Sequence, residues 1–202
     1  MASGTRTIIV AAGLGSRMER YTEDKPKCML DFGGKTLLQR QLEVYRASGI
    51  NDISVVRGYQ KNKINYDDLN FFENPEFEDT NILHSLFCAE EAIFGHVICA
   101  YSDILFDNYV LDCVLESQHD ISVVVDVDWR RYYEGRRDHP LEEAENIIFD
   151  ANNKVVMAGK IMADKSDAHG EFIGMMKFSP QGSKIFKQHY HRARQIYTGM
   201  PF

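Results

Sequence analysis

The sequence predicts an α/β fold in which a mostly parallel β-sheet is flanked by helices. Short apolar, β-branched runs alternate along the chain with segments whose apolar residues recur at helical spacing. Glycines and helix-capping residues stand between these segments, where strands and helices would end or begin. The chain has 202 residues, 44% of them hydrophobic and 26% charged, which is enough to bury one core. We therefore expect residues 1–202 to form a single domain.

The first part of the pattern is a strand, a loop, a helix and a second strand. Thr7–Ala11 is expected to be a buried strand because it is apolar, β-branched and followed by glycines. A helix is expected over Leu37–Ser48, and Gly49 follows it as a stop signal. Ile53–Val56 has the composition of the next strand. This order is typical of parallel strands joined by a crossover helix.

The alternation continues to the end of the chain. Further strands are expected at residues 69–72, 96–100, 121–127, 147–149, 155–157 and 171–179. Three further helices are expected. One covers 82–93 and is capped by Thr80 or Asn81, a second begins after a cap at Asp107 or Asn108, and a third begins at Pro180. Residues 128–145 are polar and longer than an ordinary connection, which is typical of a functional loop.

Charge and cysteine usage exclude several classes of protein. A formal net charge of -7 argues against a protein that coats nucleic acid or an anionic membrane. The four cysteines, at positions 28, 88, 99 and 113, lack the spacing of a zinc site or a disulfide framework. No signal-peptide pattern and no bilayer-spanning apolar run stand in the sequence, so we expect a cytoplasmic protein.

The strongest motif is the glycine-rich loop Ala11–Met18, between the first strand and the first helix. Glycines at positions 13 and 15 let backbone N–H groups approach phosphate oxygens closely. Arg17 and Lys27 add positive charge suited to the same anion. A tight turn without a ligand is the alternative, and a glycine pair alone does not decide between them. The candidate nucleotide-binding residues of the loop are Ala11, Ala12, Gly13, Gly15 and Ser16.

Two better-known phosphate-binding motifs do not fit the sequence. A dinucleotide-binding fingerprint requires glycine or alanine where Met18 stands. Gly34-Lys35-Thr36 has the ending of a Walker A loop, but the earlier glycine of that motif falls at Met29. The loop therefore belongs to another class of phosphate-binding turn.

The N-terminal part of the chain resembles the start of the sugar-phosphate and phosphocholine nucleotidyltransferase superfamily. The resemblance lies in the order of glycines, arginine and lysine in residues 11–18 and 25–27, followed by residues 37–58. The resemblance implies a Rossmann-like, mixed but mostly parallel sheet of the nucleotide-diphospho-sugar transferase type. It also implies that the loop grips a nucleoside triphosphate and that Arg17 and Lys27 are the catalytic cations.

Asp103 follows the expected strand at 96–100, at the same edge of the sheet as the loop. A carboxylate at this place can hold Mg²⁺, and a helix cap or a solvated aspartate is the alternative. The resemblance implies a metal-binding aspartate here. It also implies that Asn81 and Ser85, four residues apart on one helical face, contact the nucleobase and ribose. A helix cap with a serine of no special role is the alternative for that pair.

The polar segment 129–146 mixes aromatic residues, arginines and carboxylates. Arginines suit an anionic acceptor, while aromatic faces and carboxylates suit an amine. A solvated loop and an RNA-stacking segment are the alternatives. Residues 101–106, 126–146 and 168–174 resemble the cytidylyltransferase domains of phosphonate biosynthesis, which occur with phosphoenolpyruvate mutase. The acceptor-binding candidates are Trp129, Arg130, Tyr133, Glu145, Lys160 and Glu171.

The resemblance implies CMP transfer from CTP to a small phosphonate, such as 2-aminoethylphosphonate or a hydroxyalkylphosphonate, with Mg²⁺ as cofactor. The attacking oxygen is already anionic, so the reaction depends on positioning and charge stabilisation rather than on a nucleophile pair. Phosphocholine or a sugar 1-phosphate is the alternative acceptor. A homodimer, or fusion to a phosphonate-pathway enzyme, fits the resemblance; nucleic acid and membrane partners do not.

Related chains continue into a further segment that carries a second metal-binding aspartate. This chain has no residue at a matching position, so we expect it to lack that segment. Either Asp126 or Asp128 compensates for the missing aspartate, or catalysis is impaired. A non-catalytic nucleotide-binding domain is the alternative function.

Overall fold

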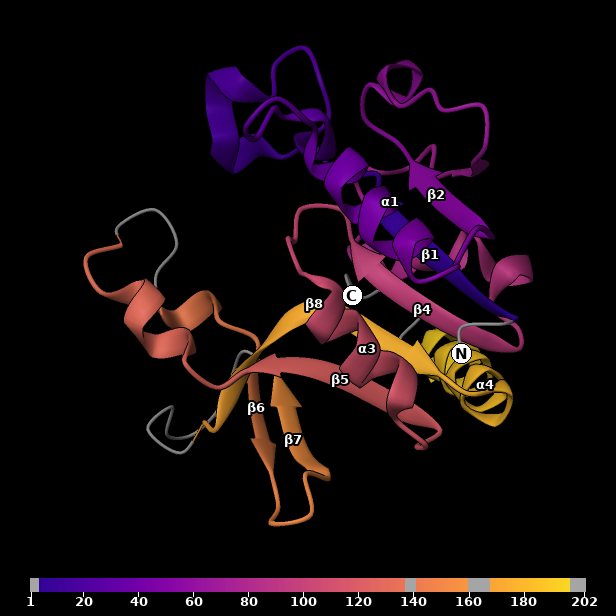
Figure 1. Cartoon of the computed structure of the whole chain (residues 1–202), viewed down its shortest axis with the longest axis vertical. Coiled ribbons are helices and arrows are strands. Elements are labelled where there is room, and N and C mark those ends of the chain that lie inside the picture. Colours follow the sequence, from indigo (N-terminus) through magenta and orange to yellow (C-terminus); the bar gives the residue numbers. More distant parts are fainter. Residues whose placement is uncertain (1–3, 137–140, 160–167, 197–202) are drawn as a thin grey trace. The chain divides into compact units, whose positions relative to one another are not determined.

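The computed structural model describes residues 4–136, 141–159 and 168–196, which fall into two compact units (Figure 1). The first unit comprises Met1–Ser122 and Met176–Phe202, and the second comprises Val123–Met175. Strands β5 (Ile121–Asp126) and β8 (Gly170–Phe178) each contribute residues to both units. The predicted α/β fold with a mostly parallel sheet is confirmed.

The first unit is built around the central strand β1. The strand order is β3-β2-β1-β4, continued by β8. The pairs β3–β2, β2–β1 and β1–β4 are all parallel. Ile9 of β1 stands opposite Val55 on one side and Ala100 on the other. Since parallel strands end at a common edge, the segments that follow β1, β2 and β4 meet there. The strand bounds are β1 (Thr5–Ala11), β2 (Ile53–Arg57), β3 (Asn70–Glu73) and β4 (His96–Tyr101).

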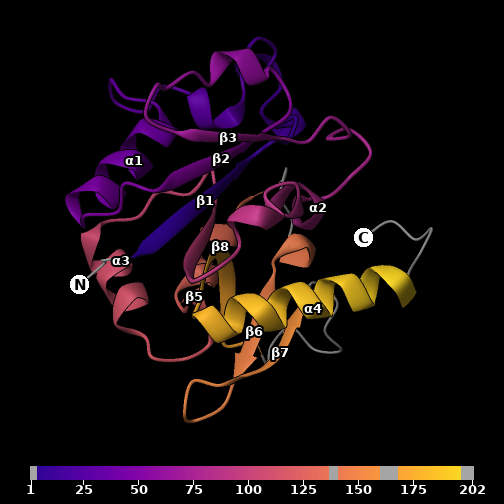
Figure 2. The same ribbon diagram turned by 90° about the vertical axis from the view of Figure 1, so that its right-hand side faces the viewer.

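Helices cover both faces of this sheet, with α1 and α3 on one side and α2 and α4 on the other (Figure 2). Their bounds are α1 (Leu37–Ala47), α2 (Ile82–Phe87), α3 (Asn108–Glu116) and α4 (Pro180–Ile196). Asn81 caps α2, since its Oδ1 accepts from the His84 N–H at 2.9 Å, and Asp107 caps α3 in the same way. These caps confirm one member of each predicted pair.

The predicted helix over 82–93 is wrong in its second half. α2 ends at Phe87, and a 3₁₀ helix follows at Glu90–Ala92. Ala89 has left the helical conformation, at φ −102° and ψ 28°, although its side chain stays buried. The remaining 3₁₀ helices are Ser16–Tyr21, Lys27–Met29, Lys61–Lys63, Trp129–Tyr133 and Leu141–Glu143.

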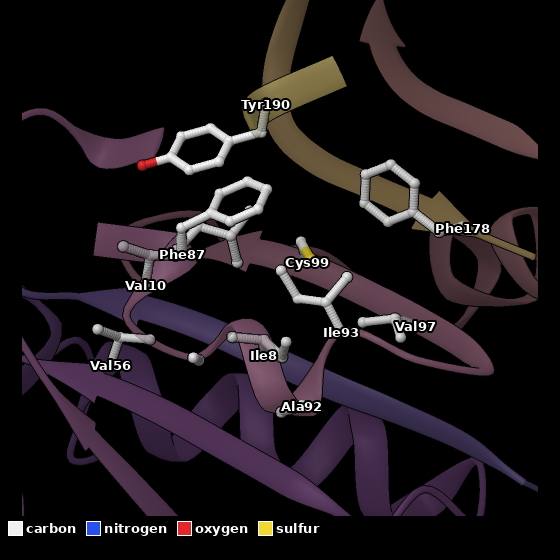
Figure 3. Packing of buried hydrophobic residues seen from close by; sticks show 12 residues of the cluster. Ile8, Val10, Val56, Phe87, Ala92, Ile93, Val97, Cys99, Phe178 and Tyr190 are labelled. Atoms are coloured by element: carbon white, nitrogen blue, oxygen red, sulfur yellow. The ribbon is translucent and has the colours of Figure 1, made fainter. Parts of the chain in front are cut away.

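Aromatic stacking joins α2 to α4 over the sheet (Figure 3). The Phe87 and Tyr190 rings are nearly parallel, with centroids 3.4 Å apart, and they cover Ile8 and Val10 of β1. Such a pair contributes roughly 0.5–1.5 kcal/mol beyond the apolar area it buries. The core therefore fixes β1, whose carboxyl end carries the glycine-rich loop.

The second unit contains an antiparallel part of the sheet. β6 (Asn146–Phe149) pairs with β7 (Val155–Gly159) and with β8, and β5 also pairs with β8. The β6–β7 turn is held by Asp150, whose Oδ1 accepts from the Asn152 and Lys154 N–H groups at 2.9 Å each. This confirms the strands predicted at 147–149 and 155–157.

The helices of the described ranges are all too short or too polar to cross a membrane.

The packing of α4 against the chain before β5 depends on Gly182. A Cβ at this position would lie 1.8 Å from the Asp120 carbonyl oxygen, so Gly182→Ala forces α4 away from its place. We expect the variant to lose about 2–3 kcal/mol of unfolding free energy in urea denaturation. Gln181→Ala, at an exposed neighbour, should change it by less than about 0.5 kcal/mol. Equal stability of Gly182→Ala and the wild type would contradict this packing.

Candidate active site

The glycine-rich loop leaves β1 at Ala11 and turns into the 3₁₀ helix Ser16–Tyr21. Gly15 adopts φ 66°, and its carbonyl accepts from the Met18 N–H at 2.9 Å. A Cβ at Gly15 would also lie 3.2 Å from Thr22 Cγ2, so both backbone conformation and space favour glycine. Gly13 differs, because its Cβ position has nothing within 4 Å beyond the chain neighbours. The backbone at Gly13 is thus open to an approaching anion.

Thr22 holds the loop through its side-chain hydroxyl, a role that was not predicted from the sequence. Its side chain lies within hydrogen-bonding distance of the Gly15 carbonyl oxygen, at 2.9 Å, and of the Glu19 carbonyl oxygen, at 3.2 Å. Thr22 is only 4% exposed, and Glu19 has an unusual positive φ of 44°. The hydroxyl therefore helps hold a loop whose backbone conformation is unfavourable by itself. A lone threonine outside any motif gives no sequence signal of this role.

Gly58 and Tyr59 fix the loop from the end of β2, and they were not predicted either. A Cβ at Gly58 would lie 2.6 Å from the Ala12 carbonyl oxygen, and the Tyr59 N–H donates to that oxygen at 3.0 Å. The Tyr59 hydroxyl also donates to the Glu23 carbonyl at 2.6 Å. A glycine two residues after the second predicted strand is the one signal that pointed to this close approach.

The structure brings Lys27 and Asp103 together across 76 positions of sequence. Lys27 Nζ lies 2.6 Å from Asp103 Oδ2, and both side chains are about one-third exposed, at 37% and 34%. The prediction that Asp103 lies at the same edge of the sheet as the loop is confirmed. Arg17 is exposed within the 3₁₀ helix that follows Gly15. The catalytic and metal-binding roles of these residues stay predictions.

Asp103 lies in a turn, Tyr101–Ile104, that is tied to its surroundings on several sides. The Ser102 N–H donates to the Val10 carbonyl at 3.2 Å, which extends the pairing of β4 with β1. Burial raises the pKa of the Cys28 thiol, which lies near Ser102, to about 12. The Gln41 side chain binds the turn from the side of α1.

The donor set at Asp103 fits a magnesium ion that arrives with a nucleotide. Within residues 4–136, 141–159 and 168–196, no three His, Cys, Asp or Glu side chains are grouped so as to hold a metal. Mg²⁺ in nucleotide sites is commonly held by one or two carboxylates, with phosphate and water oxygens completing its shell. Asp103 supplies one such carboxylate. Asp126 and Asp128, the expected substitutes for a second one, belong to the second unit.

Asn81 and Ser85 have structural contacts in addition to their predicted role. Asn81 caps α2, and Ser85 is 5% exposed. The Ser85 hydroxyl donates to the Asn81 carbonyl at 3.2 Å and accepts from Asn74 Nδ2 at 2.9 Å. Contacts of this pair with the nucleobase and ribose stay a prediction.

In the second unit, Trp129 lies inside a small hydrophobic cluster. It is 1% exposed and packs with Ala144 and Ala168. The Tyr133 ring meets it edge-on at 5.7 Å, and the Arg130 guanidinium lies 5.1 Å from its ring centroid. Sequence reasoning placed Trp129 in an acceptor pocket, whereas its observed contacts are those of a core residue. The predicted acceptor contact stays untested.

The other acceptor-binding candidates surround this cluster. The Arg130 guanidinium donates to the Ala168 carbonyl at 3.2 Å, and the Tyr133 hydroxyl donates to Glu171 Oε1. Burial, and then the bond to Glu171, raise the pKa of the Tyr133 hydroxyl, so it stays a donor. The Glu145 carbonyl accepts from the Phe172 N–H, which places Glu145 beside β8. Lys160 lies outside the described residues.

Comparisons with known proteins point to nucleotidyl transfer. A family model described as the MobA-like NTP transferase domain matches residues 7–163. CTP:phosphoglutamine cytidylyltransferase of Campylobacter jejuni is 35% identical over 188 residues, which cover 86% of this chain and 73% of that protein. 2-Aminoethylphosphonate cytidylyltransferase of Lancefieldella rimae is 28% identical over 116 residues, which cover 54% of this chain and 47% of that protein.

A solved structure of CTP:phosphocholine cytidylyltransferase from Streptococcus pneumoniae has the same fold. It superposes with a TM-score of 0.66 at 22% identity, over 94% of this chain and 78% of that one. This likeness confirms the expected Rossmann-like class of sheet.

The loop should lose its shape when Thr22 loses its hydroxyl. We expect Thr22→Val to lower the unfolding free energy by about 1 kcal/mol, the usual net contribution of a hydrogen bond. We also expect it to weaken nucleoside triphosphate binding in titration calorimetry, because the N–H groups of the loop are no longer fixed. Thr22→Ser keeps the hydroxyl and serves as the control. Equal nucleotide affinity in the two variants would show that the hydroxyl does not order the loop.

Proposed function

The chain belongs to the MobA-like NTP transferase family of nucleotidyltransferases, and we propose that it is a Mg²⁺-dependent cytidylyltransferase acting on a small phosphonate. CMP passes from CTP to the acceptor, for which 2-aminoethylphosphonate is our first candidate, and pyrophosphate is released. The observation that carries the proposal is the Lys27–Asp103 pair, which lies at the same sheet edge as the glycine-rich loop. The choice of CTP rests on the cytidylyltransferases that the chain is similar to.

The loop is assigned to the triphosphate. Its N–H groups around Gly13 are open, while Gly15 is fixed by Thr22 and Ala12 by Tyr59. A loop that is already ordered before the nucleotide binds loses little conformational entropy on binding. More of its interaction energy is therefore available to stabilise the transition state. Arg17 and Lys27 offset the charge of the phosphates on either side of the bond that breaks.

The reaction needs no protein nucleophile. An anionic oxygen of the acceptor attacks the α-phosphorus of CTP, a new P–O bond forms, and the bond to the β-phosphate oxygen breaks to release pyrophosphate. Asp103 would hold Mg²⁺, which supplies positive charge to the phosphate oxygens when bound. Lys27 is kept beside that carboxylate by the 2.6 Å contact, so its ammonium stays close to the same phosphates. Both groups lower the repulsion between two anionic substrates.

The acceptor is assigned to residues of the second unit. Phosphoglutamine, phosphocholine and 2-aminoethylphosphonate, named in the three relatives, are all small, carry a phosphorus oxyanion and contain nitrogen. Glu171, whose carboxylate is held by the Tyr133 hydroxyl, is the group we assign to the amine. Arg130 is assigned to the oxyanion. Phosphoglutamine is the second candidate acceptor, favoured by 35% identity over 86% of this chain.

The donor and the acceptor can be tested together by measuring pyrophosphate release. The protein is incubated with Mg²⁺, each of the four NTPs and 2-aminoethylphosphonate, a hydroxyalkylphosphonate, phosphocholine, phosphoglutamine or glucose 1-phosphate. We expect fastest release with CTP and 2-aminoethylphosphonate, and none when EDTA removes the metal. Release with phosphoglutamine alone would move the acceptor to the second candidate. No acceptor-dependent release with CTP would leave only the non-catalytic alternative or another donor.

The role of Lys27 can be separated from the general effect of removing a surface charge. We expect Lys27→Met to lower kcat/KM by about 10²–10³-fold, the usual cost of losing a group that stabilises transition-state charge. Lys35 pairs with Glu43 at 2.7 Å and is similarly exposed, so Lys35→Met is the matched control, expected within about twofold of the wild type. Comparable losses in the two variants would remove Lys27 from the catalytic machinery.

A further inference from the structure

The turn Tyr101–Ile104 is tied at both ends by one side chain. Gln41 Nε2 donates to the Tyr101 carbonyl at 2.9 Å and to the Ile104 carbonyl at 2.7 Å. Both protons of the side-chain amide are therefore used, and Asp103 lies between the two carbonyl groups that accept them. The position of the Asp103 backbone is thus set by α1, a helix distant from it in sequence.

Gln41 is an unusual residue for its place in α1. It is 1% exposed and stands on the buried face of the helix, together with Leu38, Leu42 and Tyr45. Its Oε1 is buried and has no hydrogen-bond partner, which costs free energy. A methionine or leucine would fill this position without a buried unpaired oxygen. The two bonds that Gln41 donates to the turn account directly for a glutamine at this position.

The same turn is tied to the segment that carries Lys27. Cys28 is the next residue after Lys27, and Ser102 is the residue before Asp103; both are buried. The Ser102 N–H binds the Val10 carbonyl of β1 at 3.2 Å, while Gln41 holds the turn through two of its carbonyl groups. The 2.6 Å contact of Lys27 with Asp103 is made by this restrained turn.

We propose that Gln41 is a positioning residue, which holds the Tyr101–Ile104 turn so that the Asp103 carboxylate stays beside Lys27 in the geometry that receives a metal-bound nucleotide. The inference rests on the proposed function, because it assigns Gln41 a part in the metal-binding role of Asp103. Gln41 touches neither substrate, and it acts only through the backbone of the turn. Outer-shell partners of this kind typically change metal affinity by about 10–100-fold when removed.

The test compares Gln41→Met with Gln39→Met. Methionine has nearly the volume of glutamine but no donor, and Gln39 lies on the same helix with its side-chain amide directed to Glu43. Mn²⁺ binding in the presence of CTP is measured by electron paramagnetic resonance, and CTP binding in EDTA is measured by calorimetry. Hydrogen exchange of a peptide that covers residues 101–104 reports on the turn in the absence of any ligand.

For Gln41→Met we expect faster exchange in that peptide and about tenfold weaker Mn²⁺ binding with CTP, with CTP affinity in EDTA unchanged. Gln39→Met should match the wild type in all three measurements. Unchanged exchange, or unchanged Mn²⁺ binding, in a folded Gln41→Met would overturn the inference. If Gln41→Met does not fold, Gln41→Asn, with its amide one methylene shorter, is measured against the same expectations.

A failure of the proposed function looks different in these data. Wild-type protein that binds no Mn²⁺ with CTP would remove the metal site at Asp103, and the inference about Gln41 with it. Wild-type protein that binds Mn²⁺, beside a Gln41→Met variant that binds it equally well, leaves the proposed function intact and removes Gln41 alone.

Discussion

The parallel pairing of β1 with a strand on each side is the constraint on which the rest of the site depends. Val10 stands opposite Val56 in β2 and Tyr101 in β4, so three strands end within about one residue of each other. Two further hydrogen bonds prolong this pairing beyond the strands, from Tyr59 to Ala12 and from Ser102 to Val10. The glycine-rich loop and the Asp103 turn are therefore neighbours because of the register of a buried sheet. Neither depends on its own sequence for that placement.

The parts of the fold that local sequence determines were predictable. Apolar runs gave the strands, and the capping side chains of Asn81 and Asp107 marked two helix starts, because the relevant contacts lie within four residues. The edge position of Asp103 was also predictable, since it follows from the direction of parallel strands. The end of α2 was not predictable, because Ala89 stays buried outside helical conformation and so continues the apolar pattern past the end of the helix.

The residues that fix the site were missed for a common reason. Thr22, Gly58 and Gln41 act on backbone carbonyl groups of other segments, and a carbonyl group has no sequence signature. Gln41 has one sequence signal, because it is a polar residue on the apolar face of α1. The helix was predicted from its hydrophobic neighbours on that face, so this signal was not used. Trp129 stands in a polar, arginine-rich stretch of sequence, which gave no signal of its burial. Its 3₁₀ helix turns the indole ring onto Ala144 and Ala168, and its contact with the acceptor stays a prediction.

Local geometry also explains how a chain of net charge -7 can hold a polyanionic nucleotide. Charges separated by more than the Debye length, about 8 Å at physiological ionic strength, are largely screened, so the distant carboxylates contribute little at the loop. Groups within a few ångströms decide the local potential, and there the Lys27 charge is offset by Asp103 at 2.6 Å. A nucleotide that brings its own metal ion would engage that carboxylate and leave the lysine charge to the phosphates. In the proposed function this pair receives a metal-bound nucleotide, and the role we propose for Gln41 is to keep Asp103 in place for it.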